Sequence, residues 1–268
     1  MMTVGRIAAN VFKESVRDKI LYSLVLFAVL LIAASLLLSQ LTAGQEVKII
    51  KDLGLAAISV IGLFIAVFIG IGLVSKEVEK RSIYSLLAKP MTRPQLILGK
   101  FFGLTLTLAV KVAIMTAALY VVLAVYSMRA PDAMKAAWDA PALDPSLMKA
   151  TFLIFIELTI VTAIALLFST YSSPIWSTIF TFGLVVAGQF SADLKNFEHV
   201  LSARPLVWLM RGLYYVLPNL ATFDVKLQVV HGQPVPLSYV AMSMAYAGLY
   251  IGALLLGAMI VFARRDFK

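Results

Sequence analysis

Long apolar segments recur along the chain and constrain its fold more than any other feature of the sequence. Segments such as residues 20–41 and 101–126 are more than 20 residues long and hold at most one charged side chain. A helix needs about 20 consecutive apolar residues to cross the hydrocarbon core of a bilayer. With 61% of its 268 residues hydrophobic and 14% charged, the chain is more apolar than a soluble domain. The sequence therefore predicts an all-α integral membrane protein.

We expect one membrane domain, residues 1–268, with six transmembrane helices. The predicted spans are residues 20–41, 53–74, 101–126, 150–171, 174–190 and 239–263. The fifth span opens with Ser172, Ser173 and Pro174, which are typical of a helix N-terminus. In the second span Gly54, Gly62 and Gly70 recur every eight residues, so we expect another helix to approach that face closely.

Two segments outside the spans have the pattern of amphipathic helices. Residues 3–19 separate apolar from basic side chains, which favours a helix lying at the membrane interface, with a solvated helix as the alternative. Residues 206–216 repeat apolar side chains at helical spacing before Pro218. We expect short amphipathic or re-entrant outer helices there, because a seventh span would place Arg211 inside the membrane.

Basic residues flank the predicted spans unevenly. With the N-terminus inside, thirteen Lys and Arg fall on the inner side, nine on the outer side, and Lys111 lies within a span. Because cations concentrate on the cytoplasmic side of membrane proteins, we expect both termini in the cytoplasm and a multi-pass protein of a prokaryotic inner (cell) membrane. The net charge of +9 then reflects topology, and we expect no nucleic-acid partner.

The sequence lacks the motifs of common catalytic and cofactor sites. It has no cysteine, which excludes disulfides and thiol catalysis. HExxH, GxxxxGK[ST] and GxGxxG motifs are absent, and the two histidines, His199 and His231, have no metal-ligand spacing. We therefore expect no catalytic residue, no metal and no cofactor on this chain.

Lys111 and Glu157 are charged residues within predicted spans. At 1.5 Å per residue, Lys111 lies about 16 Å above the inner edge of the membrane and Glu157 about 20 Å above it. An unpaired charge at such depth is costly, so we predict that the two side chains form an ion pair. The pair would be structural, or it would be a polar element of a substrate path or of a proton-coupled site.

The segment from residue 75 to residue 100, which we call the charged island, lies between the second and third spans. It holds six of the 23 basic residues and two acidic ones. Ile83, Leu86 and Leu87 recur at helical spacing before Pro90. This pattern predicts a short amphipathic helix that docks into a groove on a partner, with a solvated loop as the alternative.

The charged island resembles the corresponding segment of type 2 ABC transporter permeases. Members of that family show Glu-x-Glu, a Gly-Thr or Arg-Thr/Ser pair, Leu-Leu, Pro, a Ser/Thr-Arg pair and Gly-Lys. Here these fall on Glu77, Glu79, Arg81-Ser82, Leu86-Leu87, Pro90, Thr92-Arg93 and Gly99-Lys100. Arg81-Ser82 departs from the Gly-Thr of many members but keeps the hydroxyl group. Within the family the chain looks closest to the branch that contains the copper-maturation permease of nitrous oxide reductase clusters.

The resemblance implies a half-transporter that exports its substrate. A second copy of the chain or a related permease would pair with it among the membrane lipids, and an extracytoplasmic accessory protein could join them. A separate ABC ATPase, carrying ATP and Mg, would bind the charged island, whose helix would be the coupling helix. The implied coupling residues are Glu77, Glu79, Arg81, Ser82, Leu86, Leu87, Pro90, Arg93 and Lys100, and the implied outer gate holds Trp208, Arg211, Tyr214, Tyr215 and Pro218.

Two alternatives from other classes depend on Lys111 and Glu157. A proton-coupled secondary carrier would use the pair without an ATPase, although inverted repeats are not evident in the sequence. A membrane-embedded enzyme would need clustered Glu, His or Asp motifs in adjacent spans, and the sequence offers only Glu157 and a lysine.

Overall fold

The computed structural model describes residues 2–41, 44–79, 92–136, 138–191, 212 and 217–264, and within them the chain is helical without strands. The helices are α1 (Met2–Val16), α2 (Lys19–Ser39), α3 (Glu46–Glu79), α5 (Arg93–Arg129), α6 (Asp132–Lys135), α7 (Ser146–Ser169), α8 (Pro174–Gln189), the 3-10 helix η2 (Leu220–Phe223), α11 (Lys226–Val230) and α12 (Leu237–Arg264). The predicted all-α class is confirmed.

Five of the described helices are long and apolar enough to cross a membrane. They are α2, α3 over Glu46–Gly72, α5, α7 and α12. Helix α8 is apolar but has 16 residues. At 1.5 Å per residue it is about 24 Å long, shorter than a hydrocarbon core of about 30 Å. The sixth span through α8 therefore stays a prediction.

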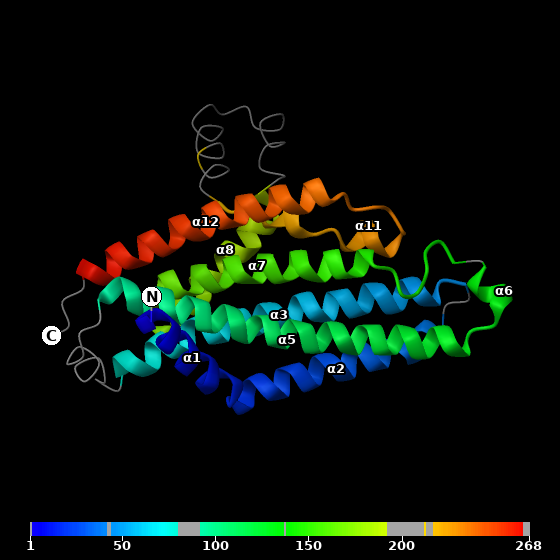
Figure 1. The fold of residues 1–268 in the computed structure, drawn as a ribbon, viewed down its shortest axis with the longest axis horizontal. Helices are drawn as coiled ribbons and strands as arrows, with labels where there is room; N and C mark the ends of the chain where they lie inside the picture. Colours follow the sequence, from blue (N-terminus) through cyan, green and yellow to red (C-terminus); the bar gives the residue numbers. More distant parts are fainter. Residues whose placement is uncertain are drawn as a thin grey trace.

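The long helices run side by side along one axis (Figure 1). Helix α1 and the last turn of α12 lie at one end of this bundle, which we call the inner end; α6 and the turn between α2 and α3 lie at the other, which we call the outer end. Two elements from opposite parts of the sequence thus lie at the same end of the bundle.

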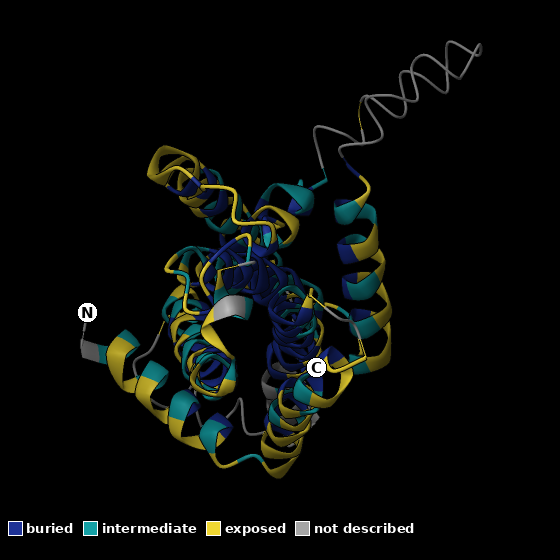
Figure 2. Cartoon of the chain, turned by 90° about the vertical axis from the view of Figure 1, so that its right-hand side faces the viewer, coloured by how far each residue is buried: buried dark blue, intermediate teal, exposed yellow. Residues whose placement is uncertain are grey.

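Helices α3 and α7 form the centre of the bundle. Their spans are 67% and 72% buried, whereas those of α2 and α12 are 28% and 22% buried. The buried residues accordingly concentrate along the middle of the end-on view (Figure 2). A Cβ added to Gly62 or Gly70 would lie 2.5 Å from Leu158 or Ala165 of α7. The predicted close approach at these glycines is confirmed.

Helix α3 begins at Glu46, seven residues before the predicted start of the second span. The charged residues in this stretch have partners within the fold. The Nζ of the buried Lys51 donates to the carbonyl of Pro141 at 2.8 Å, and Lys48 bridges to Asp139 at 2.5 Å. Helix α3 can carry these two lysines into the bundle because the loop at 139–141 provides an acceptor for each of them.

Both flanking helices extend into the charged island, whose bounds as a segment outside the membrane stay a prediction. Helix α3 continues to Glu79, and α5 begins at Arg93. Thr92 precedes α5, and its backbone N–H donates a hydrogen bond of 3.3 Å to Oε1 of Gln95. Such a contact stabilises a first helical turn. The central residues of the island, 80–91, lie outside the described residues.

The remaining predicted spans differ from the helices by a few residues at each end. Helix α8 starts at Pro174 with Ser173 as its N-cap, as predicted. In the outer region η2 and α11 are short helices that follow the predicted helical pattern in the sequence. The predicted helical pattern over residues 206–216 lies outside the described residues, apart from Gly212.

Candidate functional site

The implied coupling residues are divided between two helices and the part of the island that is not described. Glu77 and Glu79 lie in the last turns of α3, and Arg93 and Lys100 lie at the start of α5. Arg81, Ser82, Leu86, Leu87 and Pro90 lie outside the described residues. The side chain of Lys100 is 3% exposed, so it offers almost no surface to a partner in this conformation.

Helix α1 packs directly on the first turns of α5. A Cβ added to Gly99 would lie 2.6 Å from that of Ile7, and one added to Gly103 would lie 2.6 Å from the carbonyl oxygen of Ala8. Two glycines four residues apart allow helix backbones to approach closely in a membrane. The N-terminal helix is therefore fixed to the helix that follows the island.

Arg93 ties the same part of α5 to the other end of the sequence. Its Nη1 donates to the carbonyl oxygens of Phe262 at 3.0 Å and of Ala263 at 2.9 Å. These carbonyls belong to the last turn of α12, where helix geometry leaves the C=O groups without intrahelical donors. A cation at a helix C-terminus is also favoured by the helix dipole.

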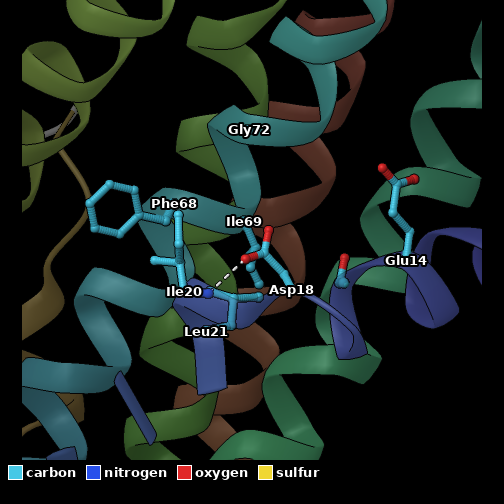
Figure 3. A pocket seen from close by; sticks show the side chains of 8 residues that line it. Glu14, Asp18, Ile20, Leu21, Phe68, Ile69 and Gly72 are labelled. Carbon is cyan, nitrogen blue, oxygen red and sulfur yellow. Dashed lines mark hydrogen bonds between the residues drawn. The ribbon is translucent and has the colours of Figure 1, made fainter. Parts of the chain in front are cut away.

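A small cavity lies at the bend between α1 and α2 (Figure 3). It has a volume of about 150 Å³, with Phe68, Ile69 and Gly72 of α3 on one side and Glu14 and Asp18 on the other. Asp18 starts α2, because its Oδ1 accepts a hydrogen bond from the backbone N–H of Ile20 at 2.9 Å. Among the described residues, no three His, Asp or Glu side chains gather as a metal site.

Lys111 is buried on α5 and faces α2. Its Nζ lies 4.1 Å from the centroid of the Tyr22 ring, and the side chain is 2% exposed. A desolvated ammonium over an aromatic face is attracted by the ring quadrupole. Tyr22 lies one turn after the start of α2, so Lys111 holds the inner part of α2 against α5.

Glu157 is buried on α7 and faces α8. Its Oε1 accepts a hydrogen bond of 2.6 Å from Nε2 of Gln189, the last residue of α8. Lys226 and Asp224 add nearby charges, and Nζ of Lys226 lies 3.4 Å from Asp224 and 3.5 Å from Ser59 of α3. Four elements, α3, α7, α8 and α11, thus meet at one polar cluster.

The predicted ion pair between Lys111 and Glu157 is wrong, because each residue has a different partner. The helix rise fixes depth but not the face of the helix on which a side chain lies. A groove of about 430 Å³ opens between α5 and α7, lined by Ala109, Val112, Ala113, Thr116, Ala117, Tyr120, Met148, Thr151, Phe152 and Phe155. Lys111 and Glu157 each lie about half a turn from the side that lines this groove, at 3.6 residues per turn.

A second cleft separates η2 from the outer half of α12. It has a volume of about 490 Å³, and its lining includes three tyrosines of α12. Tyr239 OH donates to the carbonyl of Thr222 at 2.6 Å, and the backbone N–H of Asn219 donates to Tyr246 OH at 2.8 Å. These bonds hold the segment after the implied gate against α12.

One residue of the implied outer gate, Pro218, is described. It is buried, and its carbonyl oxygen would lie 2.8 Å from a Cβ added to Gly188 of α8. The other four, Trp208, Arg211, Tyr214 and Tyr215, lie outside the described residues. The ends of the segment between α8 and η2 are therefore held together at its base.

Lys51 and Gln189 are structurally important residues that the sequence analysis missed. In the sequence Lys51 lies outside the predicted spans, and Gln189 is a polar residue near the end of an apolar span. Neither belongs to a motif, so only the spatial position of Pro141 and of Glu157 reveals their roles.

The sequence matches the family described as "ABC-2 family transporter protein" from residue 6 to residue 267. The chain belongs to the ABC-2 transporter family. A comparison with curated proteins finds no significant match. The predicted type 2 ABC permease is therefore confirmed at the level of the family.

Membership of the ABC-2 family gives the described helices a function. The chain is a multi-pass membrane permease subunit of an ABC transporter, and permeases of this family are transport components that are not themselves catalytic. Such permeases typically work with an ABC ATPase.

Proposed function

We propose that the chain is the permease of an ATP-driven exporter, assembled from two permease chains and separate ATPase chains that hold ATP and Mg. The observation that carries the proposal is the position of the charged island. The end of α3 and the start of α5 lie together at the inner end and bracket residues 80–91 (Figure 1). An ATPase that binds this segment would act on two helices at once.

Both helices are suited to carry a displacement into the membrane. Helix α3 continues seven residues beyond Gly72, the end of its apolar span, and α5 runs without interruption from Arg93 to Arg129. The extension of α3 is about 10 Å long at 1.5 Å per residue. A rigid extension outside the bilayer would turn a push on the island into a tilt of the span.

The outer gate in this proposal is the segment between α8 and η2, with Trp208, Arg211, Tyr214, Tyr215 and Pro218 as its residues. The hydrogen bond between Gln189 and Glu157 would hold the base of the gate on α7. Outward opening would then require the end of α8 to move away from Glu157. We also propose that the chain belongs to the branch of the family that contains the copper-maturation permease of nitrous oxide reductase clusters.

The orientation in the proposal places the inner end in the cytoplasm of a prokaryotic cell. The support is the excess of basic residues beside the inner span ends and the position of α1 and of the last turn of α12 at that same end. The second permease, membrane lipids and an extracytoplasmic accessory protein would complete the assembly.

The test is copurification of the tagged chain from native membranes in mild detergent, followed by mass spectrometry. We expect a P-loop ATPase to accompany the wild-type chain and to be lost when Leu86→Arg and Leu87→Arg are combined. The matched control combines Leu86→Met with Leu87→Met, which keeps both side chains apolar.

A chain that purifies without an ATPase and still transports in vesicles would contradict the proposal and favour a secondary carrier. The structure offers that alternative little support, because Lys111 and Glu157 have separate partners.

A further inference from the structure

Helix α12 is the least buried of the long helices, with 22% of its span buried. Its buried residues include Leu255, Ala258 and Phe262. A Cβ added to Gly257 would lie 3.7 Å from the side chain of Leu167 of α7. Side-chain packing therefore holds α12 on the bundle with few residues. A specific tie at its last turn consequently has a large share in fixing its position.

Arg93 makes this contact with the last turn of α12, and it lies just after the central residues of the charged island. It is the first residue of α5, directly after the charged island, yet it bonds to carbonyls 169 and 170 positions later in the sequence. One guanidinium nitrogen serves two carbonyl oxygens, of Phe262 and Ala263, so the contact restrains both direction and distance.

Helix α1 belongs to the same group of elements. Gly99 and Gly103 bring its backbone onto α5 within two or three turns of Arg93. The start of α5 is therefore joined to α1 on one side and to the end of α12 on another. In contrast, the end of α3 enters the island from the central pair of helices.

We propose that Arg93 is a positioning residue that makes the inner ends of α5 and α12 move as one unit when the island is displaced. Arg93 then acts on α12 rather than contacting the ATPase, which revises the role implied by the resemblance. This inference rests on the proposed function, since it requires an ATPase that moves the island. Its consequence is that α12 shares in every transport cycle although it is remote from the island in sequence.

The experiment measures distances between spin labels in the complex of the chain with its ATPase. The chain has no cysteine, so labels can be placed at chosen positions without removing native ones. Phe102 of α5, Ile260 of α12 and Phe68 of α3 are exposed and suit replacement by cysteine in pairs. Distances are recorded without nucleotide and with the ATPase trapped by ATP and vanadate.

In the otherwise unchanged chain we expect the distance from Phe102→Cys to Ile260→Cys to stay constant on trapping, while the distance from Phe102→Cys to Phe68→Cys changes. With Arg93→Ala added, the first distance should shift or split into two populations on trapping. Arg93→Lys, which keeps a cationic donor, should restore the single population. Arg6→Ala removes an exposed cation from α1 at the same end and should leave all distances unchanged.

Two results would overturn the inference. One is a distance between α5 and α12 that changes on trapping while Arg93 is intact. The other is an Arg93→Ala chain whose distances match those of the unchanged chain in both states. If Arg93→Ala fails to fold, the distances in the intact chain and in Arg93→Lys still decide the first point.

The failure of the proposed function has a different signature. If no ATPase associates with the intact chain, or if trapping changes neither distance, then the ATP-driven mechanism is wrong and the inference falls with it. If trapping changes the distance between α3 and α5 but Arg93→Ala has no effect, the mechanism stands and only the role of Arg93 is wrong.

Discussion

The two ends of the bundle are held together by different chemistry. At the outer end lysines reach across to neighbouring segments: Lys48 to Asp139, Lys51 to the carbonyl of Pro141, and Lys149 to the carbonyl of Val235 at 2.7 Å. At the inner end glycines bring α1 onto α5, and Arg93 joins α5 to the last turn of α12. Lysine cross-links thus join segments at the outer end, whereas close backbone packing and the contact of Arg93 join helices at the inner end.

This difference indicates where a conformational change can start. The outer lysines connect α3 with the loop before α7, and α7 with the segment before α12. At the inner end the end of α3 is joined to the start of α5 through residues 80–91 of the chain, and the start of α5 is held by α1 and by the contact of Arg93 with α12. A force applied to the island would therefore act first on the inner end, with the outer end following as a body.

The largest expected effect comes from breaking the glycine contact of the inner end with Gly103→Leu. The new side chain would collide with the backbone oxygen of Ala8, and backbone cannot move aside as a flexible side chain does. Overpacking costs roughly 1–3 kcal/mol, and we expect a loss at the upper end of this range. Thermal unfolding in detergent measures it.

Gly5→Leu is the control for that substitution, because nothing lies within 4 Å of a Cβ added to Gly5 on α1. We expect its melting temperature to stay close to that of the wild-type chain. Equal losses in the two variants would mean that the contact between α1 and α5 does not hold the inner end.

The next largest effect comes from removing one outer cross-link with Lys51→Met. Methionine keeps much of the apolar stem but removes the hydrogen bond from the buried Lys51 ammonium to the Pro141 carbonyl, and a hydrogen bond from a charged donor contributes about 1.5–3 kcal/mol. We expect a lower melting temperature and easier proteolysis of the loop between α5 and α7. Lys135→Met removes an exposed lysine paired with Asp132 in the same region and should have almost no effect.

Exchanging the charges of Lys111 and Glu157 tests whether these two side chains interact with each other. Lys111→Glu and Glu157→Lys each remove a buried interaction, with Tyr22 or with Gln189, and each should lower the yield of folded protein. Since the two sites have separate partners, we expect the double variant to be no better than the worse single variant. Recovery of the wild-type yield in the double variant would show that the two charges pair after all.

The membrane helices and several of their contacts could be predicted from the sequence, because they follow from properties that the chain carries locally. Apolar length predicts a span, and the spacing of Gly54, Gly62 and Gly70 predicts a face that neighbouring helices approach closely, which is α5 at Gly54 and α7 at Gly62 and Gly70. Ser173 and Pro174 predict the start of α8. Each of these inferences needs only neighbouring residues.

The errors occur where a distant partner decides. Lys48 and Lys51 look like loop residues until the loop at 139–141 is beside them. The depth of Lys111 and Glu157 follows from helix rise, but almost uniformly apolar helices carry no signal for the direction of one polar side chain. Arg93 matches a family motif, yet the carbonyl that it contacts in α12 lies 169 residues later in the sequence. Such partners become visible only when the helices are placed in space.

The smallest expected effect comes from the salt bridge between Lys48 and Asp139 at the outer end, in which the Asp139 side chain is exposed. The hydrogen bond and charge of Lys48 hold the pKa of Asp139 below its ordinary value. A carboxylate with a lowered pKa stabilises the fold above the pKa of the unfolded chain, and this contribution is lost as the pH falls through the lower, folded value. Asp139→Asn should thus lower the melting temperature slightly at pH 7, and the difference should vanish in strong acid. If the difference instead stays constant down to the lowest pH that the fold survives, the bridge does not contribute through its charge, and the outer end depends on the lysine–carbonyl bonds of Lys51 and Lys149 alone.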